Sequence, residues 1–222
     1  MIFSIFFSQI HRECLLHIRK PLNLVYPWAF FIMVVLLFPF ILFQDTQHLK
    51  TLLPGLIWIS ALLAYLLSVE HFFEMDHING ALECLLIYPF PFSLSIFAKT
   101  LAHWLLTGLP LTLLAPLLGY LVGLSLSEDI ILFLSLLLGT PTLSALGTLL
   151  GAVTLLTGSR GLLLGILLIP LSLPILIFGT GSVLSESMGF SSASSLSFLA
   201  AITLSSLLGT PFASATVLRS GI

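Results

Sequence analysis

The residues best placed to do chemistry lie in one segment of this 222-residue chain, between Glu70 and Lys99. Asn79-Gly80 predicts a turn, and 81–88 then predicts a short helix that Pro89 and Pro91 would stop. Such an element suits docking into a groove of a soluble partner, where apolar side chains give affinity and acids pair with Arg or Lys. The alternative, which composition alone favours, is that these acids only solvate a loop. The acids are Glu70, Glu74, Asp76 and Glu83, and the apolar residues on one face of the helix are Leu82, Leu85 and Leu86.

Catalytic motifs do not occur in the sequence. There is no G-x-x-x-x-G-K-[ST] loop to cradle ATP phosphates, no H-E-x-x-H and no G-x-S-x-G. Cys14 and Cys84 form no redox, haem-attachment or zinc pattern. We therefore expect a chain that is not an enzyme and holds no metal of its own. His48 is interpreted as a solvated loop residue rather than a haem ligand. His103 either faces a polar interhelical site or packs near the interface, and packing is favoured.

Composition excludes several classes of protein. Hydrophobic residues make up 58% of the chain and charged residues 7%, against roughly 25% charged residues in a soluble domain. A soluble enzyme and a disordered tail are excluded, because neither could be built from so few charges. A net charge of −2 provides no basic surplus for binding nucleic acid.

The spacing of the charges predicts membrane spans. Six stretches of 19 to 32 residues contain no Asp, Glu, Lys or Arg, and a spanning helix needs about 20 apolar residues. The runs are continuous and do not alternate, which argues against a β-barrel. We therefore expect an all-α polytopic membrane protein with a single transmembrane domain over residues 1–222. The six predicted helices are 22–43, 52–69, 99–123, 130–156, 162–184 and 197–218.

The distribution of Lys and Arg predicts the orientation. The side that holds the N-terminus carries six of them, and the other side carries only Lys50. Both termini are therefore expected in the cytoplasm, with short external loops at 44–51, 124–129 and 185–196 and a cytoplasmic loop at 70–98. The first apolar run is interpreted as the first span, because it is longer than the core of a signal peptide.

Residues 1–20 precede the first span and show an amphipathic pattern. Phe3, Phe6, Phe7, Ile10, Cys14 and Ile18 recur at helical spacing, with Ser4, Ser8, His11, Arg12 and Arg19 largely opposite. This pattern predicts a helix in the membrane interface. The helix either docks against a partner or is a plain anchor, and the residues leave both readings open.

Three pairs of glycines have the spacing that lets helices approach closely. We interpret them as packing sites within the chain rather than as a dimer interface. The pairs are Gly119 with Gly123, Gly147 with Gly151, and Gly161 with Gly165.

The order of residues in the cytoplasmic loop resembles that of ABC-2-type permeases, and more closely that of the CcmB, or haem exporter protein B, family. The resemblance rests on Phe73, Asp76, Asn79, Gly80, Leu82, Glu83 and Leu85, followed by Pro89, Pro91, Ala98 and Lys99. It extends through 54–58, 102–104, 107–110, 138–142 and 170–174, and so covers nearly the whole chain. Asn79 departs from the acid expected before the glycine.

This resemblance implies a permease subunit of the bacterial inner membrane that takes part in cytochrome c maturation. The loop, starting at Glu70, would couple it to a CcmA-type ATPase, in a complex with CcmC and CcmD that contains two permease copies. ATP would be used by the partner subunit to release the haem-loaded chaperone CcmE, and haem would be a handled substrate rather than a bound cofactor. The alternatives are an ABC-2 permease for a lipid, drug or glycan, and a stand-alone channel or scaffold.

Overall fold

The computed structural model describes residues 2–19, 21–41, 46–69, 72–87, 90–157 and 162–221. Helices dominate these ranges, and no strand occurs in them. In order they are α1 (Ile2–Ile18), α2 (Pro21–Ile41), α3 (Thr46–Val69), α4 (Glu74–Ile78), α5 (Ala81–Ile87), α6 (Phe92–His103), the π-helical η1 (Trp104–Gly108), α7 (Leu109–Val122), α8 (Leu126–Thr157), α9 (Leu162–Ser187) and α10 (Ala193–Gly221).

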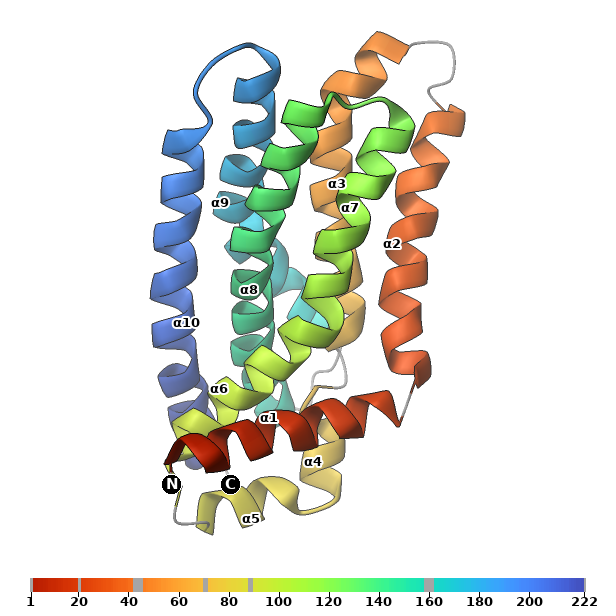
Figure 1. The fold of residues 1–222 in the computed structure, drawn as a ribbon. Helices are drawn as coiled ribbons and strands as arrows, with labels where there is room; N and C mark the ends of the chain where they lie inside the picture. Colours follow the sequence, from red (N-terminus) through yellow and green to blue (C-terminus); the bar gives the residue numbers. More distant parts are fainter. Residues whose placement is uncertain are drawn as a thin grey trace.

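Six of the helical segments are long and apolar enough to cross a membrane: Pro21–Phe40, Leu49–Val69, Phe92–Val122, Leu126–Leu156, Leu163–Ser187 and Ala193–Ser220. They stand side by side as a bundle, and helix α1 lies across the end of that bundle where both termini are found (Figure 1). The prediction of an all-α polytopic membrane protein with six spans is confirmed. The helix predicted over 1–20 corresponds to α1.

The third span starts earlier than predicted. Helix begins at Phe92 rather than at 99, directly after Pro91, whose carbonyl accepts hydrogen bonds from the backbone N–H groups of Leu94 and Ser95 at 2.9 and 3.2 Å. The loop predicted over 70–98 is correspondingly shorter. The prediction was wrong because it treated Lys99 as a solvated boundary residue, whereas Lys99 is buried inside the chain.

The connections at the opposite end are also shorter than predicted. Helix α3 already starts at Thr46, α8 at Leu126 and α10 at Ala193, while α9 continues to Ser187. The predicted loops 44–51, 124–129 and 185–196 are therefore too long. The error arises because charged and polar residues were assigned to loops, although several of them form the first or last helical turn.

The middle of the bundle is held by close helix contacts around a buried tryptophan. Trp58 of α3 is fully buried and lies against the backbone of Gly139 in α8 and Gly179 in α9. A Cβ at either glycine would overlap the indole ring. Small residues at these positions let the three helices approach closely, so that van der Waals packing around the indole ring holds them together.

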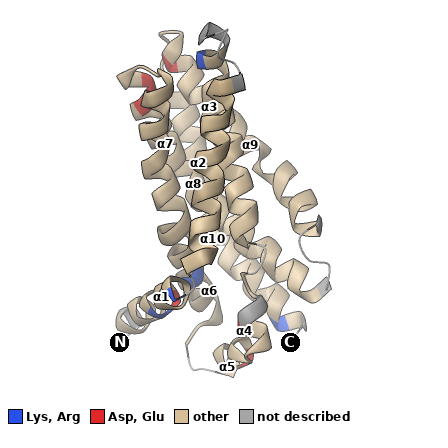
Figure 2. Ribbon diagram, turned by 90° about the vertical axis from the view of Figure 1, so that its right-hand side faces the viewer, with Lys and Arg blue, Asp and Glu red and all other residues tan. Residues whose placement is uncertain are grey.

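Among the described residues, the backbone positions of Asp, Glu, Lys and Arg fall toward the two ends of the bundle, and its middle carries none of them (Figure 2). Arg12 lies on α1, Lys99 on α6 and Arg219 in the last turn of α10, at the end that carries both termini, whereas Lys50 lies near the start of α3 at the opposite end. The apolar spans of 20 to 31 residues are long enough to cross a bilayer, which needs about 20.

The predicted packing glycines have different surroundings. A Cβ added at Gly119 would meet Asp129 and Leu124, one at Gly147 would meet Val69, one at Gly151 would meet Phe73, and one at Gly165 would come 3.7 Å from Leu66. Gly123 instead ends α7 with a φ of +108°, and the Lys50 side chain lies over it. Gly161 lies outside the described residues.

Candidate functional site

The segment between α3 and α6 folds as two short helices at the end of the bundle that carries the termini (Figure 1). Helices α4 and α5 are joined by Asn79 and Gly80, and Gly80 has a φ of +68°. Its N–H donates to the carbonyl of His77 at 3.1 Å, and its carbonyl accepts from the N–H of Cys84 at 3.2 Å. The predicted turn therefore occurs, because glycine adopts this backbone conformation without strain. Glu70 and Tyr88, at the two edges of this segment, lie outside the described residues.

One face of this helical pair is turned into the chain. Phe73 and Leu82 are buried, at 2% and 1% exposed, and Leu85 packs against the same core. The ring of Phe73 lies so close to Gly151 of α8 that a Cβ there would come within 3.3 Å of it. The expectation that Leu82 is displayed for a partner is wrong, because its side chain fixes α5 to the bundle instead.

The other face of the pair is open. Ile78 and Ile87 are 64% and 85% exposed, and Asn79 and Cys84 are exposed beside them. The carboxylate of Glu83 lies 3.4 Å from Nδ1 of His77, and both of these side chains are substantially exposed. Together these residues form a small surface with apolar tips and one acid, which we call the α4–α5 outer face: Ile78, Asn79, Glu83, Cys84 and Ile87.

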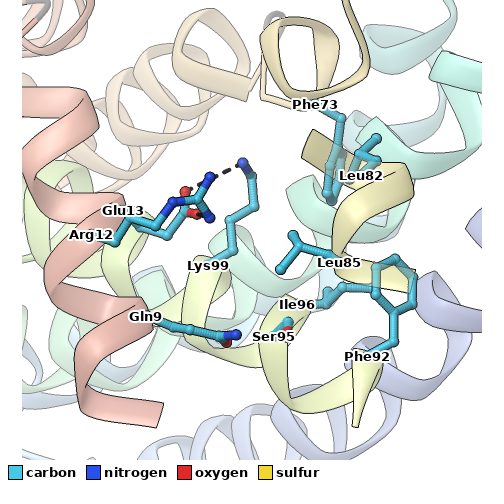
Figure 3. Close-up of a pocket in the computed structure, with 10 residues that line it drawn as sticks. All are labelled: Gln9, Arg12, Glu13, Phe73, Leu82, Leu85, Phe92, Ser95, Ile96 and Lys99. Carbon is cyan, nitrogen blue, oxygen red and sulfur yellow. Dashed lines mark hydrogen bonds and ion pairs between the residues drawn. The ribbon is translucent and has the colours of Figure 1, made fainter. Parts of the chain in front are cut away.

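A buried lysine ties three elements together behind this surface. The Lys99 side chain on α6 is 7% exposed. Its Nζ forms an ion pair with the carboxylate of Asp76 on α4, and it lies 3.4 Å from Oε2 of Glu13 on α1. Figure 3 shows Glu13 and Lys99 facing each other between the two helices. We call Lys99, Asp76 and Glu13 the Lys99 junction.

Aromatic rings complete the surroundings of the junction. Nζ of Lys99 lies 5.1 Å from the centre of the Phe72 ring and 5.4 Å from that of Phe73, within the range of cation–π attraction. Two carboxylates and two rings therefore compensate the cost of burying this ammonium group. The space left between α1, α5 and α6 is about 10 Å³, so the junction is closely packed.

Sequence reasoning expected Asp76 and Glu83 to act alike, as acids offered to a partner. The structure separates them, because Asp76 is engaged within the chain and Glu83 is on the α4–α5 outer face. The sequence pattern did not lead us to Glu13 as a member of the site. A usable signal was present, since Glu13 falls among Phe6, Ile10 and Cys14 on the apolar side of the amphipathic pattern, where an acid needs a buried partner.

His103 faces a polar interhelical site, which corrects the preference for simple packing. Its Nε2 lies 2.9 Å from the hydroxyl of Ser68 on α3, and its Nδ1 lies 3.1 Å from the hydroxyl of Ser144 on α8. The rings of Tyr65 and Phe72 meet it edge to face. The imidazole thus joins three helices one turn above Lys99. The side chain of His48 lies outside the described part of the chain.

The arrangement offers no reacting group and no metal cage. Among the described residues, no three His, Cys, Asp or Glu side chains gather as metal ligands. What it offers is a rigid connection between an exposed helical pair and the helices that cross the membrane.

Comparison with known proteins gives one consistent result. Residues 4–221 match the family described as CcmB protein. A protein of Pseudomonas aeruginosa named heme exporter protein B is 42% identical over 219 residues, covering 99% of this chain and 98% of its own. Proteins with the same name from Paracoccus denitrificans and Escherichia coli K12 are 44% and 38% identical, covering 86% and 97% of this chain and 88% and 99% of their own.

The order of residues in the segment 70–99, the six spans and these full-length matches agree, and the chain therefore belongs to the CcmB family.

Proposed function

We propose that this chain is the permease subunit of an ABC transporter complex for cytochrome c maturation, with ATP hydrolysed by a separate CcmA-type subunit. The observation that carries the proposal is the α4–α5 outer face, which exposes Ile78 and Ile87 on a support that is itself firmly packed. Exposed apolar tips on a rigid helix are the usual anchors of a protein interface.

The orientation follows from the charges. Arg12 and Arg19 lie on α1 and directly after it, Lys99 on α6 and Arg219 in the last turn of α10, at the end with both termini, while Lys50 lies near the start of α3 at the other end. The bias of Lys and Arg toward the cytoplasm supports an inner-membrane protein with both termini and the α4–α5 outer face on the cytoplasmic side. This is the side on which a soluble ATPase has access to ATP.

Movement of the ATPase would reach the membrane through two contacts. Leu82 and Phe73 transmit a push on α5 to α8, because Phe73 rests directly on the backbone at Gly151. The Lys99 junction transmits a displacement of α4 to α1 and α6 at the same time. The coupling residues in this proposal are Phe73, Asp76, Asn79, Gly80, Leu82, Glu83 and Leu85, with Glu70 at the start of the segment.

The relatives that match are named heme exporters, and this name supports haem as the substrate handled by the complex. We further propose CcmC and CcmD as membrane partners, two permease copies per complex, and release of haem-loaded CcmE as the step that ATP hydrolysis drives. In a six-span permease of this type one chain supplies half of a transport path, by analogy with the fold class.

Co-purification tests the proposed interface. The chain is co-expressed with CcmA, CcmC and CcmD, extracted in mild detergent, and assayed for retained CcmA and for ATP hydrolysis. Glu83→Lys should lose CcmA because it reverses the charge at the contact, and Ile87→Glu should lose it because it places a charge at an apolar contact. Glu186→Lys and Met188→Glu make the same changes at the opposite end and should retain it.

Retention of CcmA by both α4–α5 variants would overturn the assigned interface.

A strain that lacks the gene for this chain distinguishes haem from another ABC-2 substrate. Loss of c-type cytochromes is expected, and their normal formation with a retained ATPase would point to an ABC-2 permease for another substrate.

A further inference from the structure

A cavity of about 450 Å³ lies beneath α1, between this helix and the start of the bundle. Its walls come from α1, α2, the end of α3, α4 and α6, and it reaches from Arg12 at the surface to His103 and Thr107 inside. This size is in the range of cavities that hold small molecules. The cavity adjoins the Lys99 junction but extends well beyond it.

The walls of the cavity are amphipathic. Leu16, Leu24, Pro27, Leu67 and Phe72 provide apolar surface, while Arg12, His17, Asn23 and Tyr26 provide polar groups toward α1 and the start of α2. The carboxylates of Glu13 and Asp76 also line the cavity, but both are paired with Lys99. A ligand that fits this lining is a flat or elongated apolar body with a negatively charged edge that faces Arg12.

One imidazole in this cavity is free to bind a metal. Nδ1 of His17 lies 2.9 Å from the carbonyl oxygen of Glu13. Because a carbonyl only accepts, Nδ1 must carry the proton, and Nε2 keeps its lone pair. Among the described residues Nε2 has no hydrogen-bond partner. His103 differs, since both of its nitrogens are engaged by serine hydroxyls.

One cation in the cavity also has unused donors. Lys99 is committed to Glu13 and Asp76. Arg12 makes one 3.4 Å contact with Glu13 and its side chain is 46% exposed. A guanidinium has five donors in a planar fork, so Arg12 can still hold a carboxylate in two places.

We propose that this cavity binds haem as cargo, with Nε2 of His17 as an axial ligand of the iron and Arg12 holding a propionate. Histidine is a common axial ligand of haem iron, and the apolar wall suits the porphyrin ring. The inference rests on the proposed function, because it takes the cavity to face the cytoplasm, where an exporter must load. An anionic phospholipid would use the apolar wall and Arg12, but it would have no use for the imidazole.

Absorption spectroscopy separates these ligands. The full-length chain in lipid nanodiscs is titrated with ferric haem, with empty nanodiscs as the blank, and the Soret band is followed. We expect a shifted Soret band for the wild type, and a loss of affinity of more than about tenfold in His17→Ala. His11→Ala changes an exposed histidine on the same helix that does not line the cavity, and it should bind haem as the wild type does.

Two further measurements protect the result against a misfolded variant. Free imidazole should restore the Soret shift of His17→Gly. Iron-free protoporphyrin should bind the wild type and His17→Ala equally, because it needs no axial ligand. Wild-type spectra identical to the nanodisc blank would overturn the proposal, and so would an unchanged Soret band in His17→Ala. Retention of CcmA is measured separately on the same variants co-expressed with CcmA, CcmC and CcmD, so failure of the haem site and failure of the permease assignment remain distinguishable.

Discussion

Two groups of charged residues, one at each end of the bundle, are built in opposite ways. At the end without termini, Glu128 accepts hydrogen bonds from the N–H and the hydroxyl of Ser125 at 2.7 Å, three residues earlier in the chain. At the other end, Lys99 binds residues that lie 23 and 86 positions away. The Ser125–Glu128 pair closes a turn locally with exposed groups, whereas the Lys99 junction joins distant elements through buried ones. Of these two groupings, only the Lys99 junction connects three separate helices.

Removing the buried cation should give the largest effect. Lys99→Met leaves two carboxylates without their partner, and losing one member of a buried pair costs about 3–5 kcal/mol. We expect a marked fall in the apparent Tm in detergent, measured by thermal unfolding. Lys50→Met, which changes the lysine at the opposite end, should leave the apparent Tm nearly unchanged.

A rescue variant sharpens this prediction. Adding Glu13→Gln and Asp76→Asn to Lys99→Met removes the unpaired charges and should recover a large part of the lost Tm. If the triple variant is no more stable than Lys99→Met, the cation does not act through these two acids.

Removing the acid at the opposite end should cost less. Ser125 and Glu128 form a capping box at the start of α8. Glu128→Ala should lower stability by about 1 kcal/mol, the usual worth of a cap, and leave retention of CcmA intact. A fall as large as that of Lys99→Met would remove the distinction between the two ends.

The smallest effect is expected for the maleimide reactivity of the two cysteines, Cys14 and Cys84, which both lie at the end that carries the termini. Cys84 is exposed on the α4–α5 outer face, while Cys14 on α1 is partly covered. Burial, and then the neighbouring Glu13 carboxylate, raise the pKa of the Cys14 thiol above its ordinary value. At neutral pH Cys14 therefore has less reactive thiolate, and it should react with a maleimide more slowly than Cys84.

The pH dependence of the labelling rate tests whether the pKa of the Cys14 thiol is raised. Because the pKa is raised, labelling of Cys14 should still accelerate at a pH where an ordinary thiol has reached its plateau. Both cysteines should be labelled by an impermeant reagent in inside-out vesicles only, followed by mass spectrometry. Equal rates at neutral pH would show that Cys14 is not covered by the packing of α1 against the rest of the chain.

The sequence was sufficient for features that depend on local composition. Six charge-free stretches predicted six spans, and Asn79-Gly80 predicted the turn between α4 and α5. Both depend on residues close together in the chain. The start of α6 was misplaced for the opposite reason, since the environment of Lys99 is set by Glu13, which is 86 positions away.

The same limit explains the errors within the site. Leu82 and Glu83 are neighbours, and the helical pattern alone does not say which face of α5 meets the bundle. The packing of Phe73 on Gly151 decides it. His103 was misjudged because its partners, Ser68 and Ser144, come from two other helices, and no periodicity in α6 reveals them.

Cross-linking in native membranes tests the central claim most directly, namely that the α4–α5 outer face is the contact with the ATPase. Cys14 and Cys84 are replaced by serine, a single cysteine is placed by Ile87→Cys or by Met188→Cys, and a photoreactive maleimide is attached. We predict that CcmA is cross-linked from position 87 and not from position 188. A cross-link from position 188, or none from position 87 while CcmA is present in the complex, would contradict the account.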